Sequence, residues 1–374
     1  MYPLGMIFAF LSSHALLKAL REKSLMWPVV YALYATALIY THYFGFFTII
    51  AHALFVGGVL VHATKWRVGE MVQSRIFWGL ILAVCLSLAL FSPWIPTFLR
   101  QRSQVQEAYW VPPIAATSVP DTFYQFFIPT SHIPPHRGLI LAVSLLPILG
   151  TIALWAYILM RYKKLDAAWL SVMLTVVPLI VAVAVSLTGR SLYNDRFFGF
   201  SGIFIFVLLA YAVASLKRPR TRKIVFIICI LGFAASFARY WNELDIASKP
   251  GAQGATHHIF SERAPSDPVL VSSPYIYFAI LHYASEEFGA PQVPRLYSPS
   301  GELAHFSGGP IMIQQDIVGD SGIAAYNDTV WVVDTTGFTE SPFVQPGHWR
   351  EVSREVFPEV FVHQGDIIVR KFEL

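Results

Sequence analysis

Long apolar runs are the feature of this sequence that most limits how the chain can fold. A helix needs about 20 mostly apolar residues to cross the hydrocarbon core of a membrane. Eight stretches reach or approach this length: Leu4–Leu20, Trp27–Tyr40, Phe44–Val61, Ile76–Ile95, Leu139–Met160, Ala167–Leu187, Phe197–Leu216 and Ile224–Trp241. We therefore expect a polytopic α-helical membrane protein with about eight spans, in which the second and third spans form a tight hairpin.

The composition agrees with this reading. Of the 374 residues, 55% are hydrophobic and only 13% are charged, whereas soluble domains have about 25% charged residues. These values exclude an ordinary soluble enzyme, a disordered chain, a collagen and a coiled coil. Cys85 and Cys229 both lie inside apolar runs, so no disulfide framework is expected either.

Charge divides the chain into two parts. Residues 1–241 contain 20 Lys and Arg against 6 Asp and Glu, whereas residues 242–374 contain 7 against 17. Basic blocks can bind nucleic acid, but here they lie between apolar runs, which favours a role in membrane topology and no nucleic-acid partner. We expect a transmembrane helical bundle over 1–241 and a soluble domain over 242–374.

The basic residues also predict an orientation. If all eight spans are right, 14 Lys and Arg fall on one face of the membrane, in loops 18–26, 62–75, 161–166 and 217–223. The opposite face has only five arginines, and cytoplasmic loops are the ones enriched in Lys and Arg. The prediction is a multi-pass protein of the plasma or inner membrane, with residues 242–374 on the extracytoplasmic side.

The start of the chain does not have the features of a signal peptide. Met1-Tyr2-Pro3 leads directly into an apolar run, with no basic segment before it and no small-residue cleavage site after it. An N-terminus on the outer side with nothing ahead of it predicts that earlier spans are missing. The alternative is a first helix anchored in the reverse orientation.

The acidic part has the pattern of a small α/β domain. Buried strands are predicted at Pro268–Ser272 and Thr329–Asp334, and helical spacing is present over Tyr275–Phe288. Glu359–His363 and Asp366–Phe372 flank Gln364-Gly365, which predicts a hairpin turn.

Known catalytic and cofactor motifs are missing from the sequence. There is no Gly-rich phosphate loop, nucleophile elbow or zinc signature. His132 and His136 are separated by two prolines that prevent a helix from aligning them, so we expect no metal site and no cofactor. His14, His52 and His62, in or near spans, are interpreted as packing or interface histidines, although an ionisable group inside a membrane is also a signal of function.

Polar residues beside the predicted outer ends of the spans are the candidate site. Arg196 follows Asp195 at the start of the seventh span, with Arg190 and Tyr193 nearby. A guanidinium there can bind a phosphate through two parallel hydrogen bonds, or it can anchor the span at the interface in a pair with Asp195.

His42 and Tyr43 lie at the tip of the 27–61 hairpin, on the same predicted face. A polar pair in so apolar a region can line a cavity, although the need for a turn between two helices explains it equally well. The sequence alone leaves both alternatives open.

Four short motifs together resemble a known family. They are Met-Tyr-Pro-Leu at 1–4, Tyr-Thr-His-Tyr-Phe-Gly at 40–45, Tyr-Asn-Asp-Arg-Phe-Phe at 193–198 and Val-Trp-Val-Val-Asp at 330–334. With the order of spans, the aromatic loop at 96–137 and the α/β tail, the chain resembles the later part of C-type integral-membrane glycosyltransferases, the group of the protein O-mannosyltransferases and the lipid A aminoarabinose transferase.

The resemblance implies transfer of a sugar from a polyprenyl-phosphate donor to a lipid or cell-envelope acceptor on the outer face. It implies that Arg196 contacts the lipid phosphate and that His42 and Tyr43 lie near the sugar-phosphate cavity. The acidic residue that is central in this family precedes the region matching Met1, so this sequence identifies no catalytic residue. Two alternatives are a non-catalytic protein that binds carrier lipid or assists envelope assembly and, less favoured, a transporter.

Overall fold

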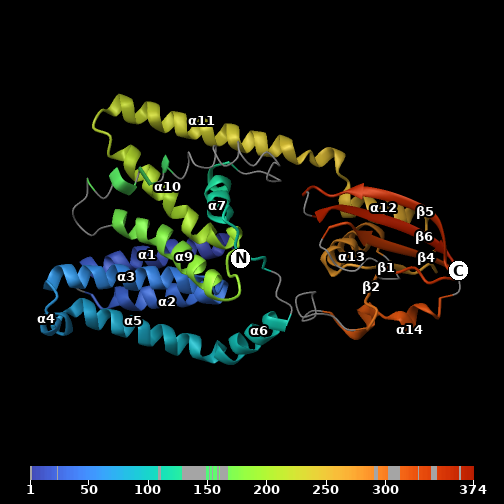
Figure 1. Ribbon diagram of the computed structural model, residues 1–374, viewed down its shortest axis with the longest axis horizontal. Helices are drawn as coiled ribbons and strands as arrows, with labels where there is room; N and C mark the ends of the chain where they lie inside the picture. Colours follow the sequence, from blue (N-terminus) through green and yellow to red (C-terminus); the bar gives the residue numbers. More distant parts are fainter. Residues whose placement is uncertain are drawn as a thin grey trace. The chain divides into compact units, whose positions relative to one another are not determined.

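The computed structural model describes most of the chain and places it in two compact units. The described residues are 2–22, 24–107, 111–128, 149–150, 152–153, 155–157, 160, 167–289, 294–301, 312–326, 328–337, 343–361 and 364–374. One unit holds the helices from α1 to most of α11, except for the last residues of α6 from Ser103 onward, which are assigned with residues 237–374 to the other unit (Figure 1). In α11 the first unit ends at Ser236 and the second begins at Phe237, and the predicted boundary at residue 242 stays a prediction.

The first unit is helical throughout its described secondary structure. Its elements are α1 (Tyr2–Arg21), α2 (Met26–Thr41), α3 (Gly45–Thr64), α4 (Val68–Gln73), α5 (Arg75–Phe91), η1 (Ser92–Trp94), α6 (Ile95–Glu107), α7 (Ser118–Phe127), α9 (Ala167–Thr188), η2 (Asp195–Phe198), α10 (Gly199–Ala214) and α11 (Pro219–Leu244).

Six helical segments in the described part of the chain are long and apolar enough to cross a membrane. They are Tyr2–Arg21, Gly45–Thr64, Arg75–Ser103, Ala167–Thr188, Asp195–Ala214 and Pro219–Glu262. The second predicted span is an apolar helix of 16 residues, α2, which is shorter than the others. The predicted span Leu139–Met160 lies mostly outside the described residues, so the count of eight stays a prediction. These helices identify a membrane protein, as expected.

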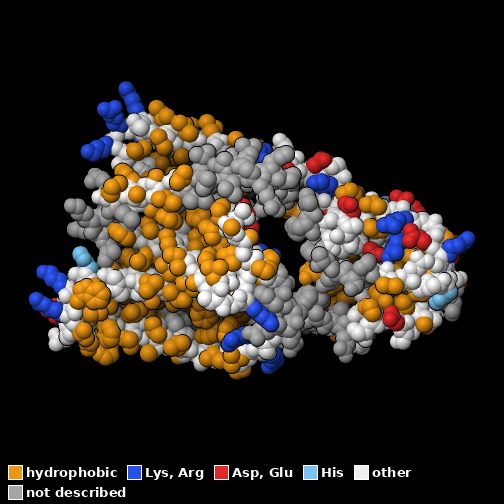
Figure 2. Space-filling model, viewed as in Figure 1, with side chains coloured by type: hydrophobic (Ala, Val, Ile, Leu, Met, Phe, Trp, Pro, Cys, Tyr) orange, Lys and Arg blue, Asp and Glu red, His pale blue; other side chains and the backbone are white. Residues whose placement is uncertain are grey.

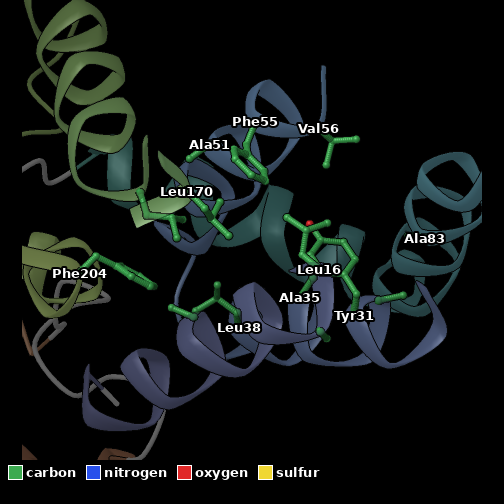
Figure 3. Packing of buried hydrophobic residues seen from close by; sticks show 14 of the residues in the cluster. Leu16, Tyr31, Ala35, Leu38, Ala51, Phe55, Val56, Ala83, Leu170 and Phe204 are labelled. Atoms are coloured by element: carbon green, nitrogen blue, oxygen red, sulfur yellow. The ribbon is translucent and has the colours of Figure 1, made fainter. Parts of the chain in front are cut away.

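The interior of this bundle combines small and large apolar side chains, and further large apolar side chains are exposed on its outside. Ala9, Ala32 and Ala51, from α1, α2 and α3, are buried in one cluster with larger residues. Figure 3 labels Ala51 and the larger Phe55 in this cluster. Leu54, the neighbour of Phe55, has 53% of its surface exposed. Membrane helices pack through small residues because lipid tails solvate leucine as well as another helix does. Alanines buried between the helices and large apolar side chains exposed outside them are therefore expected of a bundle in lipid.

The C-terminal unit is an α/β layer structure built on a six-stranded sheet. Its elements are η3 (Ile246–Ser248), α12 (Gly251–Glu262), β1 (Val269–Val271), α13 (Pro274–Phe288), β2 (Arg295–Tyr297), η4 (Gln314–Asp316), β3 (Ile317–Val318), α14 (Asp320–Ile323), β4 (Thr329–Thr335), β5 (Arg350–Pro358) and β6 (Asp366–Glu373). The strand order is β3-β2-β1-β4-β6-β5. Strands β1 to β4 are parallel, and β6 and β5 add an antiparallel edge.

One face of this sheet carries α12 and α13, whose side chains Ile259 and Tyr277 pack on Trp331 and Val333 of β4. The other face is covered by a second cluster that includes Phe343. Alternate residues of β4 therefore pack into the clusters on the two faces of the sheet. Because both faces are buried, the sequence of β4 is continuously apolar over Val330–Val333 and does not alternate.

The predicted strands at Pro268–Ser272 and Thr329–Asp334 and the helix at Tyr275–Phe288 are confirmed as β1, β4 and α13 within a few residues. The predicted strand Glu359–His363 is wrong. Its described residues form a bend, and the hairpin partner of β6 is β5, which ends at Pro358. β5 is the edge strand of the sheet, and its charged side chains face solvent on both sides, so it has no apolar alternation to detect.

Candidate functional site

His42 lies in the turn between α2 and α3, and the turn fixes the orientation of its ring. Its backbone amide donates to the Leu38 carbonyl at 3.0 Å and closes α2. Its Nδ1 accepts the Phe44 amide at 3.1 Å. Gly45 follows because a Cβ at that position would lie 2.7 Å from the Leu38 side chain. The predicted tight hairpin is therefore confirmed.

Aromatic rings from three parts of the chain surround the His42 imidazole. Their centroids lie 5.1–5.5 Å from it, and they belong to Tyr2, Phe44, Phe197 and Phe200. Tyr2 begins α1 and Phe200 lies in α10, so the hairpin tip is held against the N-terminal ends of both helices. These ends lie close together because Gly5 of α1 faces the Phe200 ring, where a Cβ would lie only 2.2 Å from a ring carbon.

This environment keeps His42 neutral. Burial lowers the pKa of His42 to about 4, and the positive charge of Arg196 adds to the effect. With Nδ1 accepting a hydrogen bond from Phe44, the single ring proton lies on Nε2. Within the described part of the chain, no hydrogen bond to Nε2 is present, so the imidazole can donate this proton to a ligand.

Arg196 is in η2, the short helical turn that leads into α10. The Asn194 and Asp195 side chains accept its backbone amide at 3.3 and 2.7 Å. Its side chain is exposed, and the guanidinium carbon lies 5.6 Å from the centroid of the Phe197 ring. Phe197 also contacts His42, so the structure brings together two of the five predicted site residues, Arg196 and His42, beside one aromatic wall.

Tyr43 points to a different neighbourhood. Its hydroxyl donates to Gln101 Oε1 at 2.6 Å and accepts from Trp94 Nε1 at 2.9 Å, and its ring packs 4.8 Å from Phe98. These partners belong to η1 and α6. They give Tyr43 a structural role in joining the hairpin to α6, and its predicted place near a substrate stays a prediction.

Tyr193 is buried, and its hydroxyl is engaged. It lies 2.7 Å from Thr122 Oγ1 and 3.1 Å from the Ser118 carbonyl of α7. Burial raises the pKa of Tyr193 to about 12. Arg190 is exposed in the segment between α9 and η2. The hydrogen bonds of Tyr193 connect this segment to α7, so they account for a tyrosine at this position without any ligand.

A buried polar trio inside the bundle was not predicted. His52 of α3 lies 2.9 Å from Ser13 Oγ of α1 through Nε2, and 3.3 Å from Tyr31 Oη of α2 through Nδ1. The Ser13 hydroxyl donates to the Ala9 carbonyl at 2.6 Å, so it accepts from the Nε2 proton, and Tyr31 then donates to Nδ1. Both ring nitrogens of His52 therefore have a hydrogen-bond partner, and the bonds connect α1, α2 and α3. This agrees with the interpretation of His52 as a packing histidine.

No group of three His, Cys, Asp or Glu side chains suited to a metal occurs among the residues placed by the structure. His132 and His136, the pair weighed in the sequence, lie outside the described residues. Among the five predicted site residues, His42 and Arg196 are the two whose side chains both contact the Phe197 ring.

Comparison of the chain with protein families, with curated proteins and with solved structures gives no match.

Proposed function

We propose that this chain is an integral-membrane glycosyltransferase, or part of one, that takes a sugar from a polyprenyl-phosphate donor and passes it to a lipid or cell-envelope acceptor. The observation that supports the proposal is the pairing of Arg196 with His42. An exposed guanidinium and an imidazole N–H that both lie beside the Phe197 ring are suited to a phosphate that carries an apolar chain.

The position of the pair along the bundle supports the outer face. His42 precedes α3, whereas Lys65 and Arg67 come after its end. α3 has 20 residues, which corresponds to about 30 Å of helix. Arg196 precedes α10 in the same way, and the basic segment 217–223 follows α10. The pair therefore lies at the end of the bundle opposite these basic segments, and basic segments are typical of the cytoplasmic side.

In the proposed reaction, the acceptor oxygen attacks the anomeric carbon and the bond from that carbon to the phosphate oxygen breaks. Negative charge grows on the departing polyprenyl phosphate, where the Arg196 guanidinium and the His42 Nε2 proton stabilise it. His42 is not the base that takes the acceptor proton, because its Nδ1 lone pair already accepts the Phe44 amide. The base that takes the acceptor proton is therefore a carboxylate of a residue other than His42 and Arg196.

The test is binding of a short-chain polyprenyl phosphate to the detergent-purified protein. A charge-assisted contact contributes about 1.5–3 kcal/mol, so Arg196→Ala should weaken binding roughly tenfold to hundredfold. Arg196→Lys should recover only part of the affinity, because an ammonium cannot make two parallel hydrogen bonds. His42→Gln keeps an N–H donor and should weaken binding less than His42→Leu.

The matched control is Arg67→Ala, which removes an exposed cation at the other end of α3 and should leave binding unchanged. If Arg196→Ala binds as tightly as the wild type, Arg196 is an interface anchor and the proposed site is wrong. Transfer of sugar from the loaded donor separates the two functional alternatives. Binding that depends on Arg196 without any transfer would favour a carrier-lipid-binding protein.

The proposed orientation predicts which side of the membrane each part of the chain faces. After replacement of Cys85 and Cys229 by alanine, a cysteine at exposed Arg220 should resist an impermeant thiol reagent in intact cells. A cysteine at exposed Ser321 of the C-terminal unit should react. Both should react after the membrane is permeabilised. The reverse pattern in intact cells would place His42 and Arg196 on the cytoplasmic side and contradict a reaction on the outer face.

A further inference from the structure

An apolar groove with a volume of about 640 Å³ lies between α10 and α11. Its walls carry Leu209, Ala210 and Val213 from α10 and Phe226, Cys229 and Ile230 from α11. The rings of Phe206 and Phe233 meet at one end of the groove, 5.4 Å apart. The other end has Arg222 and Lys223. The groove is therefore apolar along its length and cationic at one end only.

The charge at this end is not balanced by the surrounding sequence. Lys217, Arg218 and Arg220 precede Arg222 and Lys223, and the segment 217–223 contains no acidic residue. The first turn of α11 has no acidic side chain either. Cations in a first turn are unfavourable for a helix, because the amide groups there already carry partial positive charge. An anion bound at this end would relieve both repulsions.

The length of the groove matches one leaflet of a membrane. Arg222 and Phe233 are 11 residues apart in α11, which corresponds to about 16 Å of helix. Half of the hydrocarbon core is about 15 Å thick. Figure 2 shows Lys and Arg side chains gathered at the end of the helical unit where α11 begins and where α4 lies. A headgroup at Arg222 and Lys223 would thus lie at the level of the basic segments, with its acyl chain along the groove.

We propose that this groove binds one phospholipid of the surrounding membrane, with an anionic headgroup held by Arg222 and Lys223 and an acyl chain between α10 and α11. The site lies at the opposite end of α10 from the pair of Arg196 and His42 and does not depend on the proposed reaction. The lipid would cover part of the most apolar stretch of α11, none of which is buried in the structure. Basic residues between membrane helices are a recurring mode of anionic lipid recognition.

The test is native mass spectrometry of the detergent-purified chain titrated with phosphatidylglycerol and with phosphatidylcholine that have identical acyl chains. The wild type should prefer phosphatidylglycerol. Each cation near a membrane surface contributes slightly more than about fivefold, so Arg222→Gln with Lys223→Gln should reduce the preference by roughly thirtyfold. Inorganic phosphate, which has the charge without the chain, should compete weakly.

The matched control is Arg218→Gln with Arg220→Gln, which removes the same charge from the same segment but from residues that do not line the groove. It should reduce the preference far less. A second variant, Ala210→Trp, fills the groove and keeps both cations, and it should lower the affinity for both lipids. The proposal is overturned if the two charge variants lose the preference equally, or if Ala210→Trp binds phosphatidylglycerol as the wild type does.

Discussion

Replacing Asp334 with alanine should destabilise the C-terminal sheet by about 3–5 kcal/mol, because it breaks a buried ion pair between two neighbouring strands. The Asp334 carboxylate is at the end of β4, bonds the Arg370 guanidinium of β6, and accepts the Phe343 amide at 3.1 Å. The Asp334 and Arg370 side chains are nearly buried, with 6% and 13% of their surface exposed. Loss of the carboxylate therefore leaves the guanidinium charge uncompensated in a place that water reaches poorly.

Hydrogen exchange of the β4 and β6 amides in the full-length protein measures this effect. A loss of about 3–5 kcal/mol should accelerate exchange roughly a hundredfold to several thousandfold. Glu351 lies 3.9 Å from Arg370 and compensates only part of the lost charge. The double variant Asp334→Leu with Arg370→Met should exchange more slowly than Asp334→Ala, because it leaves no buried charge.

The sheet offers a matched control in the pair formed by Arg350 and Glu373. It also joins neighbouring antiparallel strands, but 76% and 51% of these two side chains are exposed. Exposed pairs contribute about 1 kcal/mol or less, so Glu373→Ala should change exchange by about fivefold at most. Equal effects of Asp334→Ala and Glu373→Ala would show that burial of the first pair does not determine its contribution.

Apart from α13, which was predicted from its helical spacing, the elements predicted from the sequence are those with long apolar runs. The run Ala167–Leu187 became α9, and Thr329–Asp334 became β4, because both are buried or lipid-facing on every side. β5 was missed for the opposite reason: it is an edge strand that needs no apolar face, and its pairing with β6 is made by the backbone. The short strands β2 and β3 are similarly fixed by their neighbours in the sheet and have little pattern of their own.

The sequence could identify the individual candidate residues, but it could not show which of them lie close together in the structure. His42 and Arg196 were each identified as polar residues at the ends of apolar runs. Their proximity depends on how α1, α10 and the α2–α3 hairpin pack against one another. Tyr193 has the same sequence context as Arg196, yet its hydroxyl is buried against α7. Sequence position beside a span therefore indicates which face a residue is on, whereas the side chains of other helices decide whether it is available to a ligand.

Phe55→Ala should have the second large effect, this time on the helical bundle. Phe55 is 1% exposed in α3 and belongs to the buried cluster shown in Figure 3. In a soluble core this change costs about 3–5 kcal/mol, of which the cavity contributes about 24 cal/mol per Å³. Lipid surrounds the separated helices and removes part of the transfer contribution. We therefore expect a loss of about 2–4 kcal/mol, which is mostly the cost of the cavity.

Leu54→Ala is the matched control, because Leu54 is the next residue of the same helix and is 53% exposed. Lipid chains can occupy the space that it leaves, so little stability should be lost. Thermal unfolding of both variants in one detergent, followed by the fraction that stays monodisperse, should show a clearly lower midpoint for Phe55→Ala alone. If Leu54→Ala lowers the midpoint as much, then the outward face of α3 is covered by protein in the native assembly, and the lipid-facing surface assigned to this bundle is wrong.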